Sequence, residues 1–306
     1  MGGAKGLSLM SGGLDSQLAV RILECAGAEV EGVCFTTPFF DCTKAEKAAQ
    51  ALGIKLHLID FLDDELELIK NPPHGFGGAM NPCIDCHALM IKRAGELMTA
   101  NGYDFVATGE VQGQRPMSQN RQSMGIVEKS SGLKGRLIRP LSALLLEPTI
   151  PELEGKLDRE KLLDISGRGR ERQIALAAEL GITDYPSPAG GCKLTETGFS
   201  NKLKDLMDHE GFAERRLVEL LTIARHFRLP DGTGLIVGRD RIDNQRIDAN
   251  ADLGELYYVK GVPGPHTLMI GGAKSDRDRR LAEEITAMYL KGSTLNRENY
   301  KAYHIC

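Results

Sequence analysis

A short glycine-rich sequence, Ser-Gly-Gly-Leu-Asp-Ser at residues 11–16, contains the residues best suited to bind an anion. An apolar, strand-like stretch precedes it and a helical pattern follows it, so backbone N–H groups and the positive end of the helix dipole converge on one spot. Gly12 and Gly13 let a ligand approach the backbone closely, while Ser11 and Ser16 add hydroxyl donors. We therefore predict a phosphate-binding loop. It lacks the lysine of the GKS or GKT loops of kinases and GTPases.

Two cysteines three residues apart open a second helical pattern. Asn81 is expected to cap this helix, and Pro82 suits its first position. The N–H groups at a helix start lower the pKa of nearby thiols, so Cys83 and Cys86 are suited to metal binding, redox chemistry or nucleophilic attack. A third cysteine, Cys192, follows two glycines in a distant turn whose backbone allows close approach to an inorganic centre.

Four interpretations of these three cysteines remain open from the residues alone. They could hold a [4Fe–4S] cluster through three of its irons, with the fourth iron open to a ligand. Cys83 and Cys86 could instead form a zinc site completed by His74 or His87. The thiols could also act as a redox pair or a persulfide relay, or their spacing could be a coincidence.

The composition indicates an ordinary globular protein. The chain has 306 residues, enough for two domains, with 42% hydrophobic and 26% charged residues. No apolar run approaches the ~20 residues of a membrane span, and residues 1–10 do not resemble a signal peptide. We therefore predict a cytoplasmic protein without a membrane partner. Its seven cysteines are then expected as thiols, redox groups or metal ligands rather than structural disulfides, with Cys25 and Cys34 in the core and Cys42 unassigned.

The net charge of −4 restricts any contact with nucleic acid to local basic clusters. The candidates are Arg115 with Arg121, Lys134 with Arg136 and Arg139, and the group Arg168, Arg170 and Arg172. Each cluster taken singly is better explained as a solvated surface. The absence of tryptophan and the 5% aromatic content argue against a large base-stacking platform.

Short apolar runs alternate with helical patterns over roughly the first 110 residues. The expected strands are 6–10, 30–36, 55–61 and 105–108, and the expected helices are 15–26, 43–52 and 83–101. A further strand is expected at 136–141, after a hairpin-like turn. This alternation predicts an α/β fold with a doubly wound parallel sheet. Ligands of such sheets bind beyond the carboxyl ends of the strands, where residues 11–16, 36–41 and 108–110 are expected to meet.

The remaining chain predicts a second, smaller domain. Residues 145–180 are mostly helical in pattern, a turn rich in proline and glycine follows at 185–192, and a helix is expected at 201–209. An α+β pattern then begins, with helices at 213–226 and 276–290 and strands at 234–237, 256–259 and 266–270. The predicted organisation is a nucleotide domain (1–185), a connecting segment carrying Cys192 (186–212), a C-terminal α+β domain (213–292) and a tail (293–306).

Together these motifs resemble the tRNA thiolation branch of the ATP pyrophosphatase (PP-loop) superfamily, which includes the tRNA 2-thiouridine synthases. The resemblance depends on residues 11–16, Asn-Pro-Cys-Ile-Asp-Cys-His at 81–87, Ala-Thr-Gly-Glu at 107–110, and the segments 165–170 and 188–192. It implies an adenine nucleotide alpha hydrolase-like fold and an ATP-dependent tRNA sulfurtransferase. ATP would adenylate a pyrimidine carbonyl, and sulfur would then replace the oxygen and release AMP.

The resemblance also implies roles for individual residues. Those that would bind phosphate are Ser11, Gly12, Gly13, Asp15 and Ser16, and those that would face the adenosine or close its site are Phe35, Thr37, Thr108 and Gly109. Asp15 would also be needed for catalysis, and Cys83, Cys86 and Cys192 would carry the sulfur chemistry. Some members of this branch hold a [4Fe–4S] cluster on three cysteines, and others use a cysteine pair as persulfide and resolving thiol.

The partners implied by the resemblance are tRNA and a sulfur donor, either sulfide or a persulfide carrier. Mg²⁺ is expected with ATP, because the phosphate charge needs to be neutralised. A homodimer is left open as the assembly.

Two features depart from the family pattern. Residues 107–110 are not followed by the paired aspartates of several relatives, so no catalytic acid is assigned there. The C-terminal part lacks the barrel domains of the bacterial 2-thiouridylases, and residues 234–240, 243–245 and 262–266 instead resemble the RNA-binding domain of NFACT proteins. The alternative functions are an adenylating ligase or sulfurtransferase that acts on a small molecule, and a non-catalytic RNA-binding module.

Overall fold

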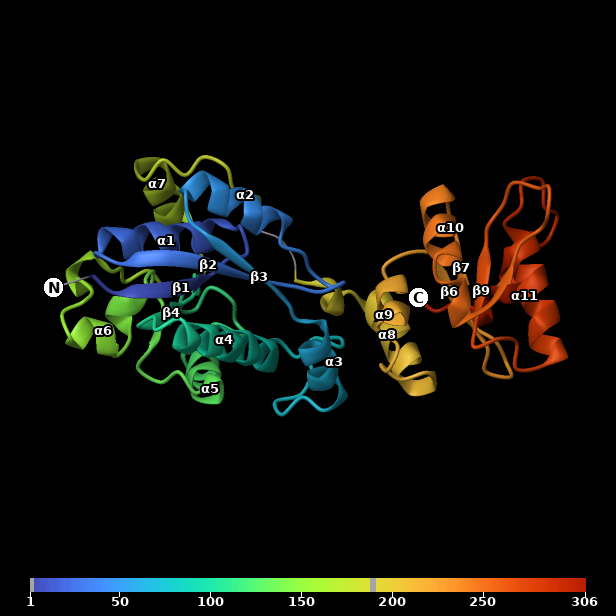
Figure 1. The fold of residues 1–306 in the computed structure, drawn as a ribbon, viewed down its shortest axis with the longest axis horizontal. Helices are drawn as coiled ribbons and strands as arrows, with labels where there is room; N and C mark the ends of the chain where they lie inside the picture. Colours follow the sequence, from blue (N-terminus) through green and yellow to red (C-terminus); the bar gives the residue numbers. More distant parts are fainter. Residues whose placement is uncertain (1–2, 188–190) are drawn as a thin grey trace. The chain divides into compact units, whose positions relative to one another are not determined.

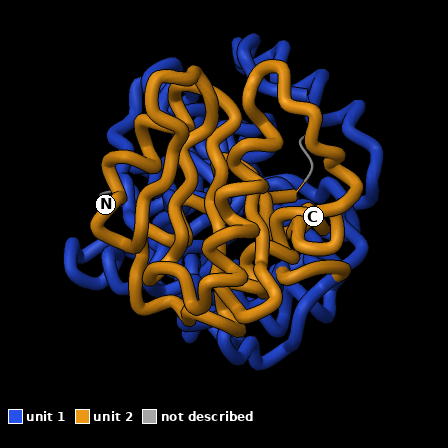
Figure 2. The backbone as a smooth tube through the Cα atoms, turned by 90° about the vertical axis from the view of Figure 1, so that its right-hand side faces the viewer, with its two compact units in different colours: residues 1–77, 81–190 blue, residues 78–80, 191–306 orange. Residues whose placement is uncertain are grey.

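The computed structural model describes residues 3–187 and 191–306. The chain forms two compact units (Figure 2). Unit 1 consists of residues 1–77 and 81–190, and unit 2 consists of residues 78–80 and 191–306. Across the described residues, no helix combines the length and the apolar character needed to cross a membrane.

Unit 1 is built on a five-stranded parallel sheet with the strand order β3-β2-β1-β4-β5. The strands are β1 (Lys5–Leu9), β2 (Glu29–Thr36), β3 (Leu56–Asp60), β4 (Phe105–Ala107) and β5 (Leu137–Ile138). In the register of the central strand, Gly6 lies opposite Val30 on one side and Phe105 on the other. The strand order runs from β1 through β2 to β3 on one side and through β4 to β5 on the other. The sheet is therefore doubly wound, as predicted.

Helices cover both faces of this sheet (Figure 1). They are α1 (Leu14–Cys25), α2 (Thr43–Leu52), α3 (Leu62–Lys70), α4 (Cys83–Ala100), α5 (Arg121–Ser131), α6 (Ile150–Leu153) and α7 (Glu171–Glu179), with 3-10 turns at Ala143–Leu145 and Arg159–Lys161. Apolar residues of α1, α2 and α7 share one core cluster, and those of α4 and α5 share a second with the opposite face. This two-sided burial explains why β4 is apolar throughout, whereas the edge strand β3 is partly exposed.

The structure departs from the predictions for unit 1 in several places. Helices α3 and α5 were not predicted: α3 is short and has three acidic residues in its first turn, and α5 has few apolar residues. The strand expected at 136–141 is confirmed but shorter: β5 covers Leu137–Ile138, follows a turn and pairs parallel to β4. Only α6 and α7 are α-helical within residues 145–180. Cys25 ends α1 on its exposed side and does not lie in the core.

Unit 2 contains a four-stranded antiparallel sheet with the order β6-β7-β9-β8, which confirms the smaller α+β domain. Its strands are β6 (Arg225–Arg228), β7 (Gly234–Val237), β8 (Gly254–Tyr257) and β9 (Thr267–Ile270). Its helices are α8 (Thr197–His209), α9 (Arg215–Leu220), α10 (Arg241–Asp248) and α11 (Asp276–Met288), with 3-10 turns at Lys193–Thr195, Ala251–Leu253 and Arg297–Tyr303.

The expected helix 213–226 is wrong at its C-terminal half. The chain turns at Ala224, which has a φ of 62°, and continues as β6. The Ala224 N–H donates to Asp243 Oδ2 at 3.1 Å, so a buried carboxylate stabilises the turn. Residues 293–306, set apart as a tail in the sequence, contribute the buried Tyr300 to the core of unit 2.

Candidate active site

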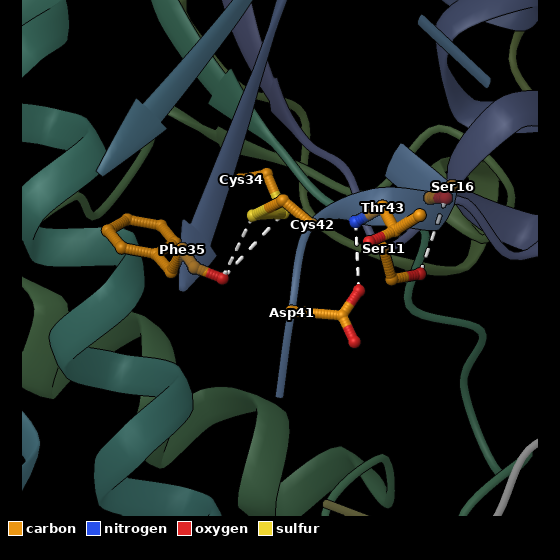
Figure 3. Close-up of a disulfide and its surroundings, with 7 residues drawn as sticks. All are labelled: Ser11, Ser16, Cys34, Phe35, Asp41, Cys42 and Thr43. Atoms are coloured by element: carbon orange, nitrogen blue, oxygen red, sulfur yellow. Dashed lines mark hydrogen bonds between the residues drawn. A yellow bond between two sulfur atoms is a disulfide. The ribbon is translucent and has the colours of Figure 1, made fainter. Parts of the chain in front are cut away.

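The predicted phosphate loop lies between the end of β1 and the start of α1, at the carboxyl edge of the parallel sheet. Gly13 is extended (φ −76°, ψ 165°), so the first turn of α1 begins directly after the loop. The Ser16 hydroxyl donates to the Gly13 carbonyl at 2.9 Å, and the Gly13 N–H donates to Ser11 Oγ at 3.3 Å. Figure 3 shows the two serine hydroxyls pointing toward each other. The loop thus presents hydroxyls and helix-start N–H groups together, which suits an anion.

Two glycines hold the loop by direct backbone contact. Gly12 has a φ of +72°, and a Cβ placed there would lie 2.3 Å from the Lys44 carbonyl carbon. A Cβ at Gly109 would lie 2.6 Å from the carbonyl carbon of Asp15. The loop, the first turn of α2 and residues 108–110 therefore meet at one place. The expected meeting of residues 11–16 with 108–110 is confirmed, and the start of α2 joins them.

Asp15 lies in the first turn of α1 and is partly buried. Its Oδ2 atom accepts a hydrogen bond from Gln114 Nε2 at 3.2 Å, and its enclosed Oδ1 atom accepts none from the described residues. Burial raises the pKa of Asp15, against the opposing effects of the Gln114 hydrogen bond and the positive charges of Arg170 and Arg115. The loop carboxylate therefore shares its surroundings with two guanidinium groups.

A disulfide closes the turn after β2. Cys34 and Cys42 are bonded, with their Cα atoms 6.0 Å apart, and both sulfurs lie beside the Phe35 carbonyl oxygen (Figure 3). The expectation that the cysteines avoid structural disulfides is wrong for this pair. Because β2 ends and α2 begins at the same edge of the sheet, cysteines eight residues apart can meet. The disulfide fixes the start of α2, the helix whose first turn contacts Gly12.

The two side chains predicted beside the adenosine face the protein interior. Phe35 is buried, and its ring packs on Phe61 with the centroids 5.1 Å apart. Thr37 is also buried, and its hydroxyl accepts a hydrogen bond from the Phe39 N–H at 3.0 Å. The backbone of this turn, rather than the Phe35 ring, is therefore the part available to a nucleotide. A role for Phe35 and Thr37 at the adenosine stays a prediction.

The paired cysteines occupy the first turn of α4, as predicted. Pro82 flanks the helix start, and the Asn81 side chain does not cap it but donates from Nδ2 to Cys83 Sγ at 3.2 Å. Cys83 is partly exposed, whereas Cys86 is buried and its thiol donates to Glu65 Oε1 at 3.4 Å. The two sulfurs of this turn thus lie in different environments, one near solvent and one beside a carboxyl group.

Glu65 is a functional candidate that the sequence analysis missed. It lies on α3 and is fully buried, and its Oε2 atom has no hydrogen-bond partner among the described residues. Burial raises the pKa of Glu65 to about 7, against the opposing hydrogen bonds from Cys86 and Thr37. A signal was present in the sequence, because Glu65 occupies the apolar face of α3 together with Leu62 and other buried residues.

A second buried carboxyl group, that of Glu110, organises the end of β4. Its Oε2 atom accepts hydrogen bonds from Arg139 Nε at 2.8 Å and from the Thr108 hydroxyl at 3.0 Å. Burial alone would raise the pKa of Glu110, but Arg139 and then His87 hold it at about 2. His87 Nδ1 lies 3.5 Å from Glu110 Oε1, so this carboxylate faces α4 beside the cysteine pair. Thr108 and Glu110 thus fix the backbone that flanks Gly109.

The third cysteine lies in a different unit of the chain from the cysteine pair: Cys192 belongs to unit 2, while Cys83 and Cys86 belong to unit 1. Cys192 is partly exposed and flanks the start of a 3-10 turn, and residues 188–190 of its predicted turn lie outside the described residues. A site made by the three cysteines stays a prediction.

The described residues form no group of three or more His, Cys, Asp or Glu side chains that could hold a metal ion. In particular, His74 Nδ1 lies 2.6 Å from Asp85 Oδ1, and His87 faces Glu110. Both imidazoles therefore contact carboxylates, which leaves the predicted zinc site without support.

The basic clusters differ in their availability to RNA. Arg139 is 2% exposed and paired with Glu110, so its expected place on an RNA-facing surface is wrong. Arg136 donates to the Asp104 carbonyl at 2.9 Å and is partly buried. Arg115 and Arg121 are exposed, as are Arg168 and Arg172.

Known families match both parts of the chain. Residues 5–129 match the family described as "tRNA methyl transferase HUP domain". Residues 224–302 match the family described as "NFACT protein RNA binding domain". Residues 5–129 are therefore similar to a HUP domain family, and residues 224–302 are similar to an RNA-binding domain family. The second match overlaps the residues whose motifs resemble the NFACT domain.

The chain is also similar to curated proteins whose names describe tRNA modification. A "Probable tRNA sulfurtransferase" of Caldanaerobacter subterraneus subsp. tengcongensis is 31% identical over 181 residues, which cover 56% of this chain and 42% of the relative. A "tRNA-specific 2-thiouridylase MnmA" of Sulfurimonas denitrificans is 37% identical over 112 residues, which cover 33% of this chain and 32% of the relative. The chain thus spans less than half the length of these relatives.

Among solved structures, a "4-thiouridine synthetase - RNA complex with bound ATP" aligns with a TM-score of 0.39 and 22% identity, covering 58% of this chain and 52% of that one. A "predicted subunit of tRNA methyltransferase" from Methanocaldococcus jannaschii aligns with a TM-score of 0.37 and 19% identity, covering 57% of this chain and 76% of that one.

The backbone contact at Gly109 predicts the effect of a single methyl group. Gly109→Ala places a Cβ against the Asp15 carbonyl and displaces the loop, so we expect ATP affinity to fall at least about tenfold, or about 1.4 kcal/mol. Gly125→Ala on α5 is the control, because no described atom lies within 4 Å of its Cβ. Titration with a fluorescent ATP analogue measures both variants. Equal affinities for Gly109→Ala and wild type would contradict the proposed packing of the loop.

Proposed function

We propose that the protein is an ATP-dependent tRNA sulfurtransferase. It adenylates a pyrimidine carbonyl of tRNA and replaces the carbonyl oxygen with sulfur, releasing AMP and pyrophosphate. One observation carries this proposal: residues 108–110 contact both the predicted phosphate loop and the helix of the cysteine pair. Gly109 packs against the Asp15 backbone, and Glu110 faces His87, which follows Cys83 and Cys86 on α4. The tRNA-thiolating relatives of the HUP domain support the substrate class.

The loop residues would bind and orient the triphosphate. Ser11 and Ser16 supply hydroxyls, while Gly12 and Gly13 leave the backbone open to the phosphate oxygens. Fixed N–H and O–H donors stabilise negative charge as it moves onto the departing pyrophosphate. The enclosed Oδ1 atom of Asp15 is the kind of oxygen ligand that Mg²⁺ prefers, so the residues present fit this ion. When bound, Mg²⁺ neutralises phosphate charge.

The cysteines would supply the sulfur chemistry. The thiols of Cys83, Cys86 and Cys192 would form the donor set of a [4Fe–4S] cluster with one open iron. When bound, such a cluster would hold the sulfur that is inserted. For a cluster, sulfide or a persulfide carrier would be the donor. The second route is a persulfide on one of these cysteines, whose outer sulfur would come from a persulfide carrier that leaves as a thiol.

The NFACT domain would bind the tRNA. Residues 224–302 match an RNA-binding family, and this match supports a role in holding the substrate. We infer that tRNA engages this domain while its target base reaches the sheet edge of unit 1. This function places the protein with its tRNA substrate in the cytoplasm.

Thiolation and nucleotide cleavage test the proposal together. Asp15→Ala removes the loop carboxylate, and we expect it to reduce tRNA-dependent release of AMP and pyrophosphate by about a hundredfold or more. Mass spectrometry of tRNA nucleosides from a deletion strain should show the loss of a thiolated pyrimidine that wild type restores and Asp15→Ala does not. Asp64→Ala, on the exposed side of α3 where it pairs with Arg93, is the control. A deletion strain with an unchanged set of thiolated nucleosides would overturn the proposal.

The metal content tests the cluster. Protein purified without oxygen should contain iron and sulfide and absorb broadly near ~400 nm. Alanine at Cys83, Cys86 or Cys192 should remove both the iron and the thiolation, whereas Cys25→Ala should remove neither. Iron-free protein that still thiolates tRNA, and loses this activity in the three variants, would favour the persulfide route instead.

A further inference from the structure

Two arginine-bearing segments of unit 1 are joined beside the phosphate loop. Gln112 pairs with Ser166 in a parallel bridge, and the Gly167 N–H donates to the Gln112 carbonyl at 2.8 Å. Gly113, with a φ of +81°, lies close against Gly167: a Cβ there would be 3.4 Å from the Gly167 nitrogen. The two segments are therefore joined at residues 112–113 and 166–167, although they are far apart in the sequence, and residues 114–115 and 168–170 follow these joined positions directly.

The first of these segments is tied to the phosphate loop. Gln114 Nε2 donates to Asp15 Oδ2 at 3.2 Å, and Arg115 is the next residue. The second segment ends at Arg170, which flanks the start of α7. The positive charges of both arginines act on the Asp15 carboxylate. Each segment thus contributes a positive charge that acts on the carboxylate of the predicted phosphate loop.

Arg170 differs from the neighbouring arginines. Its Nε atom is enclosed and donates to none of the described residues. Arg168 is exposed, and Arg172 is exposed and paired with Asp164 at 2.8 Å. An enclosed guanidinium nitrogen without a partner is costly unless a ligand accepts from it. An anion next to Asp15 would satisfy it, and a guanidinium recognises phosphate by paired hydrogen bonds.

We propose that Arg115 and Arg170 bind the β- and γ-phosphates of ATP and stabilise pyrophosphate as it leaves. This inference rests on the proposed function and names residues that the loop motif does not contain. In the adenylation step, the carbonyl oxygen of the base forms a bond to the α-phosphorus while the bond from that phosphorus to the bridging oxygen of the β-phosphate breaks. The electron pair of the broken bond stays on pyrophosphate. The two arginines meet the charge that develops there.

The same arginines were candidates for an RNA-facing surface, and their position distinguishes the two roles. A residue that contacts RNA phosphates contributes to tRNA affinity and to its salt dependence. A residue that holds the β- and γ-phosphates instead affects the use of ATP and leaves tRNA binding unchanged. Gln114 ties the first segment to Asp15, and the second segment is paired with the first, so the structure favours the second role.

Pyrophosphate release with saturating tRNA tests this inference. We expect Arg170→Ala and Arg115→Ala each to lower kcat/KM for ATP by about a hundredfold. Arg170→Lys should recover part of the loss, because it keeps the charge but not the paired hydrogen bonds. Arg21→Ala is the matched control, since Arg21 also belongs to unit 1 but pairs with Glu24 on the surface of α1. Filter binding of tRNA should be the same for all five proteins.

The outcomes separate this inference from the proposed function. Wild-type protein that releases no pyrophosphate would contradict the proposed function itself. Wild-type release that persists at full rate in Arg115→Ala and Arg170→Ala would overturn the inference alone. Weakened tRNA binding with an unchanged kcat/KM for ATP would also overturn it and assign the arginines to RNA. Arg115 is exposed, so its alanine variant is expected to fold and gives an answer even if Arg170→Ala is unstable.

Discussion

Backbone-to-backbone contact at Gly12 and Gly109 is the constraint on which the candidate site depends. A side chain at either position would overlap the backbone of a neighbouring segment, at Lys44 in one case and at Asp15 in the other. These contacts are possible because the carboxyl ends of β1, β2 and β4 lie next to one another in a parallel sheet. The loop, the start of α2 and residues 108–110 therefore form one rigid surface around the predicted phosphate position.

Buried charges reinforce this surface. The pair Arg139–Glu110 is almost fully enclosed, and loss of one partner would leave an uncompensated charge at a cost of about 3–5 kcal/mol. Glu110 also accepts the Thr108 hydroxyl and faces His87, so it links the end of β4 to the first turn of α4. Cys86 contacts the buried Glu65 on α3. Residues 109 and 110 thus contact both the loop, through Gly109, and α4, through Glu110.

Some parts of the fold and of the candidate site could be predicted from the sequence. Alternating apolar runs predicted the parallel sheet, and the glycine-rich motif predicted a loop at a helix start, because both depend on local pattern. Contacts between distant residues were not predictable in this way. The disulfide between Cys34 and Cys42 depends on β2 ending beside the start of α2, and the burial of Arg139 depends on its partner Glu110. Glu65 left a trace, as a charged residue on an apolar helix face, but its contact with Cys86 arises only in the fold.

In the proposed reaction, the loop directs the α-phosphate of ATP to a carbonyl oxygen of tRNA. The most direct measurement follows that oxygen, using a tRNA substrate labelled with ¹⁸O at the pyrimidine carbonyl that becomes thiolated. The account predicts that each turnover transfers the label to the phosphate of AMP, as seen by mass spectrometry. Unlabelled AMP, or formation of ADP in place of AMP, would contradict it.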